Sequence, residues 1–513
     1  MPAKIGAMKR AYRVDDIRAA EQQLLDLGAP LMEHASYAVA MEVIRHLKAA
    51  DCRVPGSTVM ALVGAGNNGA DALYASAALA RRGLAVTAIC CGEPHAAGLS
   101  AAQRAGVRII HNPDKTSLEQ IAGASRVWID GLLGIGARGA IREPLAGVIR
   151  MLNHLRYSSA VQPWVLAVDV PSGVGIDDGT LPGVALCADV TVTMGAAKRA
   201  LYLPPACEYA GRIVTVPLGF EPYLSADPAL VSLTAADVRD LWKIPGSHDH
   251  KYTRGVLGIL AGSRTYPGAG MLCVAGARAV GIGMVRYLGE VDAVVTSYPD
   301  VVCAPGQVQA WALGSGLDSL DEASRILHNA FAEGYPVVCD ARAIELIYDG
   351  DVPSTVVITP HAGELAALLR ARGEDITRSD IEAAPARAAR LAAALTGATV
   401  VLKGAVNVIA AAHGPLYAQG GAPGWLASAG AGDVLAGTIG ALLAMYGDEI
   451  QARGEHSDLV LRLAACACCV HAQAAQDAAQ VKNGFVGRPI TAGEVAEHIA
   501  QTIFKILGNE SYY

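Results

Sequence analysis

The chain has 513 residues, and because a single domain usually holds about 100–200 residues, this length predicts at least two domains. Hydrophobic residues make up 52% and charged residues 17%, a composition that excludes a disordered chain. The 41 Lys and Arg against 48 Asp and Glu give a net charge of −7, which argues against general binding to nucleic acids or membrane surfaces. No signal peptide or membrane-spanning run is evident, so we expect a cytoplasmic protein without membrane or nucleic-acid partners.

Strand and helix patterns alternate along the first part of the chain. Helical patterns cover residues 16–49 and Ala70–Arg82. Short apolar runs typical of buried parallel strands are Ser57–Val63, Ala85–Cys91, Arg126–Ile129, Trp164–Val168, Asp189–Met194 and Ile213–Pro217. The alternation predicts an α/β domain over residues 1–220, with a mostly parallel sheet and helices on both faces. The proline-containing segment 221–232 is predicted to be a linker.

The same alternation restarts in residues 233–513 and predicts a second α/β domain. The expected strands are Val256–Leu260, Val291–Thr296, Ala310–Leu313, Val337–Cys339, Val356–Ile358, Thr399–Leu402 and Val406–Ala411. A helical region from Asp433 to about Asp477 follows them.

A glycine-rich loop, Val63–Asp71 with the sequence VGAGNNGAD, joins a predicted strand to a predicted helix. Glycines let backbone N–H groups approach a phosphate, and a helix N-terminus favours negative charge. An ordinary tight turn would need the glycines but not Asn67, Asn68 and Asp71, whose amides and carboxylate suit a ribose or a hard cation. The loop therefore predicts a binding site.

Two further strand ends carry oxygen-rich side chains. Asp130 and Asp169 each follow a predicted strand directly. In an open parallel sheet ligands lie beyond the carboxyl ends of the strands, so we expect Asn68, Asp130, Asp169 and Ser172 to converge there. Amide, carboxylate and hydroxyl oxygens with few formal charges favour a monovalent hard cation. The alternative for each Asp is a role as a helix N-cap or turn residue.

The glycine-rich loop Val63–Asp71 resembles the corresponding loop of the NAD(P)H-hydrate epimerase domain. The resemblance covers residues 10–220 and includes the segments Asp130–Gly139, Asp169–Gly179 and Thr193–Lys198. The resemblance implies a Rossmann-like domain that interconverts the R and S epimers of NADHX and NADPHX. It implies K⁺ ligands at Asn68, Asp130 and Ser172. The implied substrate contacts are Asn67, Asn68, Gly69, Ala70, Asp71, Gly134, Ile135, Gly136, Ala137, Arg138, Gly139, Ala140 and Asp169. Ala70 stands where the family usually has glycine.

Chemically, the epimerised carbon bears a hydroxyl and the ring nitrogen, whose lone pair stabilises a cation when the C–O bond ionises. An acid/base beside the hydroxyl would speed its loss and return. Asp169 is our candidate for that role.

A second glycine-rich turn, Ser428–Asp433 with the sequence SAGAGD, precedes an apolar helix over Val434–Tyr446. Backbone amides at such a helix start can hold a transferring phosphate. The Asp433 carboxylate could accept the proton of an attacking hydroxyl, as catalytic aspartates do in phosphoryl transfer. The alternative is a simple N-capping Asp.

This turn resembles the ribokinase-like superfamily. With Gly262–Ala269, Leu313–Gly316, Asp340–Ala343, Thr359–Glu364 and Val401–Asn407, it resembles the ADP/ATP-dependent NAD(P)H-hydrate dehydratase domain over about residues 233–510. The resemblance implies hydrate contacts at Ala269, Gly316, His361 and Asp433. It implies adenine-nucleotide contacts at Lys403, Gly404, Ala405, Val406, Asn407 and Gly432, with Mg²⁺ bridging the nucleotide phosphates. His361 could instead be a structural histidine, and Lys403 could simply close a strand.

These patterns predict a bifunctional repair enzyme with catalytic residues Asp169 and Asp433. It would epimerise NADHX and NADPHX and dehydrate the S form at the expense of ADP or ATP, with a homo-oligomer as the expected assembly. One alternative is a ribokinase-like kinase of a vitamin precursor, fused to a non-catalytic nucleotide-binding module. Another is a first domain that serves only as a binding or scaffolding module.

Overall fold

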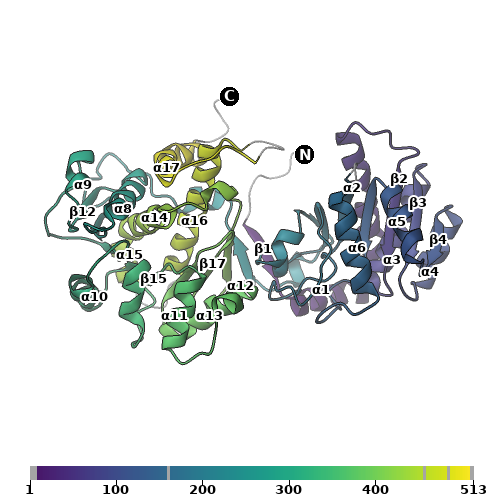
Figure 1. Cartoon of the computed structure of the whole chain (residues 1–513), viewed down its shortest axis with the longest axis horizontal. Coiled ribbons are helices and arrows are strands. Elements are labelled where there is room, and N and C mark those ends of the chain that lie inside the picture. Colours follow the sequence, from purple (N-terminus) through teal and green to yellow (C-terminus); the bar gives the residue numbers. More distant parts are fainter. Residues whose placement is uncertain (1–7, 159–161, 454–457, 482–485, 509–513) are drawn as a thin grey trace. The chain divides into compact units, whose positions relative to one another are not determined.

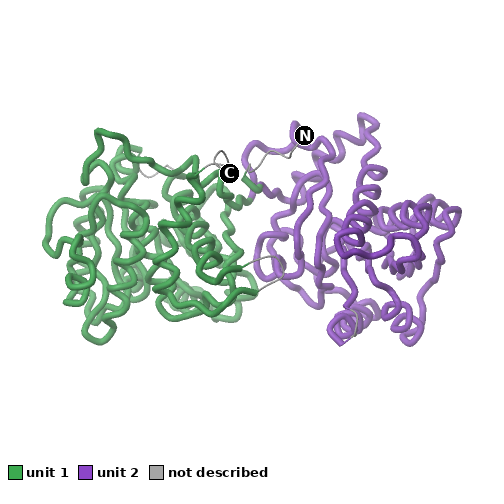
Figure 2. Tube along the Cα trace, turned by 90° about the horizontal axis from the view of Figure 1, so that it is seen from above, with its two compact units in different colours: residues 1–9, 230–513 green, residues 10–229 purple. Residues whose placement is uncertain are grey.

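The structure, a computed structural model, describes residues 8–158, 162–453, 458–481 and 486–508. It divides into two compact units, Arg10–Ala229 and the part from Leu230 onward, with Met8 and Lys9 grouped with the latter (Figures 1 and 2). The division falls between Ala229 and Leu230, inside the segment 221–232 predicted as a linker. That segment also contains a short 3-10 turn and strand β10 (Leu230–Ser232).

The first unit contains a seven-stranded parallel sheet in the order β4-β3-β2-β5-β6-β7-β9. Its strands are β2 (Thr58–Val63), β3 (Ala85–Cys90), β4 (Arg108–His111), β5 (Val127–Gly131), β6 (Trp164–Val168), β7 (Val190–Met194) and β9 (Arg212–Val216). The first six follow the Rossmann strand order, in which the chain reverses direction across the sheet between β2 and β5. The predicted Rossmann-like fold is confirmed, and this reversal point is where ligands bind in such sheets.

Helices cover both faces of this sheet. Helices α2 (Leu31–Ala49), α3 (Asn67–Ala80) and α4 (Ala96–Arg104) share one core, and α5 (Lys115–Ala124) and α6 (Leu145–Ser158) share the other. Strand β2 contributes to both because side chains alternate along a strand. Val59, Ala61 and Val63 lie in the first core, whereas Met60 and Leu62 lie in the second.

The prediction of a single helix over residues 16–49 is wrong about its continuity. The segment forms two helices, α1 (Val14–Asp26) and α2, separated by a short turn. Gly28 in this turn has φ +77°, a left-handed conformation that ends helices, and Pro30 lacks the N–H that a continuing helix would need. Just before α1, strand β1 (Lys9–Tyr12) pairs in parallel with the short strand β8 (Ala197–Lys198). In this pair Tyr12 lies opposite Lys198.

The second unit contains strands in the order β12-β11-β13-β14-β15-β16-β17-β18-β10. They are β10, β11 (Val256–Leu260), β12 (Met284–Tyr287), β13 (Ala310–Leu313), β14 (Val337–Cys339), β15 (Val356–Ile358), β16 (Thr399–Leu402), β17 (Asn407–Ala410) and β18 (Leu416–Gln419). The strands from β12 to β16 are parallel, and β17 is antiparallel to both neighbours. The prediction of a second α/β domain is confirmed.

The helices of this unit are α7 (Ala235–Leu241), α8 (Pro267–Ala279), α9 (Asp292–Ser297), α10 (Asp321–Glu333), α11 (Ala362–Ala371), α12 (Arg378–Ala383), α13 (Pro385–Thr396), α14 (Ala431–Met445), α15 (Gly447–Arg453), α16 (Leu459–Ala479) and α17 (Ala492–Leu507). The strand predicted over Val291–Thr296 is wrong, because this segment lies largely in α9. Its buried residues, Val291 and Val294, are three positions apart, which is a helical spacing. Helix α16 is long and apolar enough to cross a membrane, but 78% of its most apolar 18-residue stretch is buried inside the fold.

Helix α14 follows the second glycine-rich turn and crosses α8 at very close range. A Cβ atom at Gly437 would collide with the carbonyl oxygen of Cys273, and one at Gly276 would collide with that of Val434. Glycine at both positions therefore lets the two backbones touch. This contact fixes the start of α14, and with it the position of Asp433.

We expect Gly437→Ala to destabilise this helix pair by about 1–3 kcal/mol, since the added methyl group must push α8 and α14 apart. Native-state hydrogen exchange of the amides in α8 and α14 measures the loss. Gly493→Ala in α17 is the matched control, because its added Cβ would lie 3.9 Å from Thr491 Oγ1, which is ordinary van der Waals contact. Unchanged protection in Gly437→Ala would show that the crossing tolerates a side chain.

Candidate active sites

The glycine-rich loop of the first unit packs tightly against the end of strand β5. A Cβ atom at Gly64 would collide with the carbonyl oxygen of Leu132, and one at Gly69 with that of Gly64. These two glycines are required by packing inside the protein. A Cβ atom at Gly66 would meet no atom within 4 Å, so this glycine leaves the backbone open to a ligand.

The residues predicted in the loop divide between surface and core. Asn67 is exposed at the start of α3, whereas Gly69, Ala70 and Asp71 are buried. The Ala70 methyl group is fully buried, so it packs in the core of the unit rather than at the surface of the loop.

Asn68, Asp130 and Ser172 meet at the carboxyl ends of β2, β5 and β6. Asp130 Oδ1 accepts a hydrogen bond from Ser172 Oγ (2.7 Å), and Asp130 Oδ2 accepts one from the Ser172 backbone N–H (2.8 Å). Asn68 Nδ2 donates to the carbonyl oxygens of Leu133 (3.0 Å) and Val168 (2.6 Å). The structure thus brings together the three side chains that the sequence suggested as cation ligands.

Asp130 is fully buried, and every hydrogen-bond donor that contacts it is neutral. Burial raises the pKa of Asp130 to about 6, although the bonds from Ser172 and Leu132 lower it in part. A buried carboxylate without a cationic side chain is compensated well by a small cation. Within the described ranges no three His, Cys, Asp or Glu side chains are grouped for metal binding.

Asp169 forms a buried ion pair with Lys198. Its backbone is left-handed, with φ +67°, and its Oδ1 accepts hydrogen bonds from Thr193 Oγ1 (3.2 Å) and the Met194 N–H (3.0 Å). Lys198 is 1% exposed, and its Nζ contacts Asp169 Oδ1 and donates to the Met194 carbonyl (3.0 Å). A strained backbone held by this many partners is typical of a functional position.

Asp71 lies near this pair without a partner of its own. It is 7% exposed, and its Oδ1 has no hydrogen-bond partner. Burial, and then the nearby charges of Asp169 and Glu21, raise the pKa of Asp71 well above its usual value, against a lowering effect of Lys198. Burial and Asp169 also raise the pKa of Glu21. One lysine thus serves three carboxyl groups, and Asp71 is the one whose pKa is raised well above its usual value.

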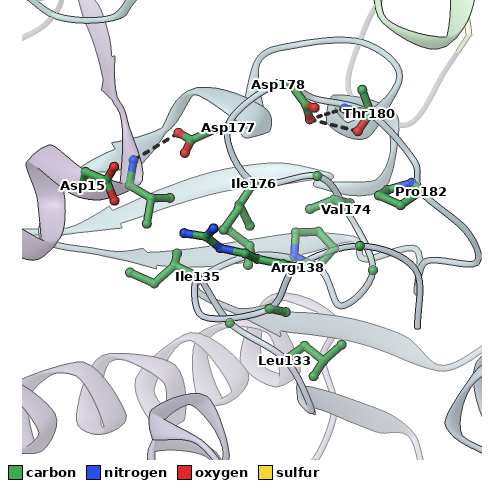
Figure 3. A pocket seen from close by; sticks show the side chains of 18 of the residues that line it. Asp15, Leu133, Ile135, Arg138, Val174, Ile176, Asp177, Asp178, Thr180 and Pro182 are labelled. Atoms are coloured by element: carbon green, nitrogen blue, oxygen red, sulfur yellow. Dashed lines mark hydrogen bonds between the residues drawn. The ribbon is translucent and has the colours of Figure 1, made fainter. Parts of the chain in front are cut away.

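A cavity of about 480 Å³ opens between the loops that follow β5 and β6 and the start of α1 (Figure 3). It is lined by five of the seven residues predicted in the second substrate segment: Gly134, Ile135, Ala137, Arg138 and Gly139. Gly136 and Ala140 are exposed and do not line it. Helix α1 is tied to both loops, since Arg18 donates to the Ile135 carbonyl (2.8 Å) and the Val14 N–H donates to Asp177 (3.0 Å). Residues 67–71 and Asp169 do not line this cavity.

The second unit contains a similar buried pair, Asp340 with Lys403. Asp340 is 2% exposed and follows β14 directly. It accepts hydrogen bonds from Lys403 Nζ (2.8 Å), Thr359 Oγ1 (2.6 Å) and Ser315 Oγ (2.7 Å). Burial raises the pKa of Asp340, but Lys403 and these hydrogen bonds outweigh it and hold the pKa below its usual value.

Asp433 lies in the first turn of α14, whose N-cap Gly430 has φ +91°. Burial and the neighbouring Asp340 raise the pKa of Asp433 to about 6, against lowering by Ser315 and Lys403. A Cβ atom at Gly432 would lie 3.3 Å from Lys403 Nζ, so the lysine amine sits beside the start of the helix. The site therefore combines a proton acceptor, a cation and free helix amides, which suit phosphoryl transfer.

The residues predicted to contact the hydrate fall into two groups, with Ala269, Gly316 and Asp433 in one and His361 in the other. Gly316, with φ +67°, is so close to Ala269 that a Cβ atom on it would lie 2.7 Å from the Ala269 Cβ. Gly316 follows Ser315, which bonds Asp340 and interacts with Asp433, so Ala269, Gly316 and Asp433 share one neighbourhood.

His361 is the N-cap of α11. Its Nδ1 accepts hydrogen bonds from the N–H groups of Gly363 (3.0 Å) and Glu364 (3.2 Å), which fixes the ring and makes it a capping residue. It also lines a cavity of about 540 Å³ together with Lys403, Gly404, Ala405, Asn407 and Gly432. Val406 does not line the cavity. Five of the six predicted nucleotide contacts are therefore gathered around one cavity.

Sequence reasoning missed four residues that the structure places in these sites. They are Glu21, Lys198, Ser315 and Asp340. Asp340 carried the same signal as Asp130 and Asp169, an Asp directly after a buried strand, and could have been found by it. Glu21 had no signal, because it lies on a helix far in sequence from the carboxyl groups that it faces.

Comparisons with known proteins agree with this division of the chain. Residues 257–495 match the family described as NAD(P)H-hydrate dehydratase, and residues 28–200 match the family described as YjeF-related protein N-terminus. A solved ADP/ATP-dependent NAD(P)H-hydrate dehydratase from Bacillus subtilis is 23% identical, with a TM-score of 0.44, over 53% of this chain and 97% of that chain.

Full-length relatives carry both parts. The bifunctional NAD(P)H-hydrate repair enzyme of Mycobacterium tuberculosis is 39% identical over 455 residues, which cover 85% of this chain and 89% of that protein. The enzyme of the same name from Corynebacterium glutamicum is 32% identical and covers 97% of this chain and 99% of that protein. The NAD(P)H-hydrate epimerase of Microbacterium testaceum is 43% identical over 43% of this chain and 84% of that protein. The chain therefore belongs to the family of bifunctional NAD(P)H-hydrate repair enzymes.

Proposed function

We propose that this chain epimerises R- and S-NAD(P)HX in its first unit and dehydrates the S form to NAD(P)H in its second, at the expense of ADP or ATP. The observation that carries the proposal is the paired arrangement of acidic groups. Each unit buries a lysine–aspartate pair beside a second aspartate with a raised pKa, Asp71 in one and Asp433 in the other. Two neighbouring carboxyl groups whose pKa values are pushed apart are what acid–base chemistry uses.

In the first unit we assign the acid/base role to Asp169, with Asp71 as the neighbouring proton reservoir. A proton is given to the hydroxyl of the hydrate, the C–O bond breaks with its electron pair on oxygen, and the ring nitrogen stabilises the cation. Water then returns to the other face of the ring and gives the proton back. The cavity beside Ile135 and Arg138 would hold the nucleotide portion of the substrate.

In the second unit Asp433 would take the proton of the hydrate hydroxyl, whose oxygen attacks the terminal phosphorus of the nucleotide while the bond from that phosphorus to the bridging oxygen breaks and the shortened nucleotide leaves. Lys403 and the amides of α14 would neutralise the phosphate charge. Inorganic phosphate then leaves the phosphorylated hydrate with the C–O electron pair, and loss of a proton from the adjacent ring carbon restores NAD(P)H. Mg²⁺ bound with the nucleotide would supply further charge neutralisation.

The remaining expectations also belong to this proposal. Asn68, Asp130 and Ser172 would hold K⁺ near the epimerase site, and we expect a cytoplasmic homo-oligomer acting on both NADHX and NADPHX. The kinase alternative shares the Asp433 loop, but it gives no role to the buried acid–base groups of the first unit.

The direct test mixes the full-length protein with an equilibrated R/S mixture of NADHX, Mg²⁺, K⁺ and either ADP or ATP, and follows recovery of NADH absorbance. We expect complete recovery with at least one nucleotide. Recovery of the S fraction alone, after correction for spontaneous epimerisation, would contradict the epimerase assignment. A stable phosphorylated product without NADH would favour the kinase alternative.

Asp433 should make dehydration depend on pH. Because its pKa is raised to about 6, the carboxyl group is protonated below that value and cannot act as a base. We expect kcat/KM for pure S-NADHX to fall tenfold per pH unit below about 6, and Asp433→Asn to lower kcat about 10²–10⁴-fold with nucleotide binding retained. A flat profile down to pH 5 would contradict the role of Asp433.

Potassium should stabilise the first unit, because a ligand bound only to the folded state shifts unfolding by mass action. We expect KCl to raise the melting temperature of the wild-type protein relative to tetramethylammonium chloride at equal ionic strength. Ser172→Ala and Asp130→Asn should lose this difference, whereas Asp26→Asn, at the exposed end of α1, should keep it. An equal response in all four proteins would exclude K⁺ at this position.

A further inference from the structure

The 540 Å³ cavity of the second unit has polar groups in its wall that the protein itself does not satisfy. Gln419 Nε2, His471 Nε2 and Ser428 Oγ have no hydrogen-bond partner, and all three residues line the cavity. Buried polar atoms in folded proteins are nearly always hydrogen-bonded, so unpartnered ones beside a cavity indicate that a ligand completes them. None of these three residues belongs to the predicted nucleotide contacts.

Gln419 and His471 differ from the rest of the polar lining in burial. Gln419 ends strand β18 and is 4% exposed, and His471 lies in α16 and is 3% exposed. Burial lowers the pKa of His471 to about 4, so its ring is neutral at pH 7. A neutral imidazole has one nitrogen that can accept a hydrogen bond, and a side-chain amide can donate one.

The same cavity also has a charged part. Lys403 and Gly432, at the start of α14, offer the positive charge and backbone amides that suit phosphates, and Ser428 belongs to the same glycine-rich loop. The apolar part of the lining includes Leu426, Leu435 and Ala472. An apolar wall with one donor and one acceptor suits a neutral planar heterocycle rather than a phosphate.

We propose that Gln419 and His471 are the residues that recognise the base of the nucleotide, with Gln419 donating to a ring nitrogen of adenine and His471 accepting from its 6-amino group. This assignment rests on the proposed use of ADP or ATP by the second unit. It makes both residues determinants of nucleotide specificity, and it leaves the chemistry to Asp433 and Lys403.

The test measures nucleotide binding by calorimetry on the full-length protein with Mg²⁺ and without hydrate, so that no turnover is needed. The ligands are ATP and purine riboside triphosphate, which lacks only the 6-amino group. The wild-type protein should bind ATP at least about fivefold more tightly, as expected for one hydrogen bond to a buried acceptor. His471→Phe should bind the two ligands equally, and Gln419→Met should bind both more weakly.

Gln473→Met is the matched control, because Gln473 lies on the same helix two residues from His471 but is exposed. It should retain the wild-type affinities. Equal affinity of the wild-type protein for the two ligands would overturn the proposal even if a variant failed to fold. Undiminished discrimination in folded His471→Phe would overturn it as well. Absence of any ATP or ADP binding by the wild-type protein would instead contradict the proposed function, which NADH recovery tests separately.

Discussion

Both units bury a lysine amine against an aspartate at the carboxyl edge of a parallel sheet. Lys198 pairs with Asp169 and Lys403 pairs with Asp340, and in each unit a second aspartate close by lacks an equal partner. Removing either lysine would leave a buried carboxylate uncompensated, which typically costs about 3–5 kcal/mol. Burial, and then the neighbouring carboxylate of the ion pair, raise the pKa of Asp71 and of Asp433, and the lysine offsets this only in part.

The fold makes this arrangement possible because parallel strands end at one edge, and their last side chains are forced together in a site that helices shield from water. Glycines let neighbouring backbones approach closely enough for these side chains to meet. Gly64 and Gly69 close the loop against β5, and Gly437 lets α14 touch α8 and so places Asp433. In both units the acidic groups lie in the first turn or turns of a helix or directly after a strand, which preserves their spacing while substrates bind and leave.

The sequence predicted those site residues whose position follows from strand order. Asn68 and Ser172 lie just beyond strands and Asp130 lies near the end of β5, and neighbouring strand ends must meet. Lys198 could not be placed in this way, because its amine reaches Asp169 from a short strand whose position depends on tertiary packing. Helix boundaries failed for local reasons, such as the turn before Pro30. The unpartnered atoms of Gln419 and His471 are visible only once both strand and helix are packed around the cavity.

Isotope-edited infrared spectroscopy tests the unequal sharing of Lys198 most directly. The protein would carry aspartate labelled with ¹³C at its side-chain carboxyl, and the protonated-carboxyl band would be followed as the pH is raised in the wild-type protein and in Asp71→Asn. Because the pKa of Asp71 is raised well above its usual value, the account predicts a component of this band that persists above the usual pKa of an aspartate and is missing from Asp71→Asn. Identical titration of the band in the two proteins would contradict the account.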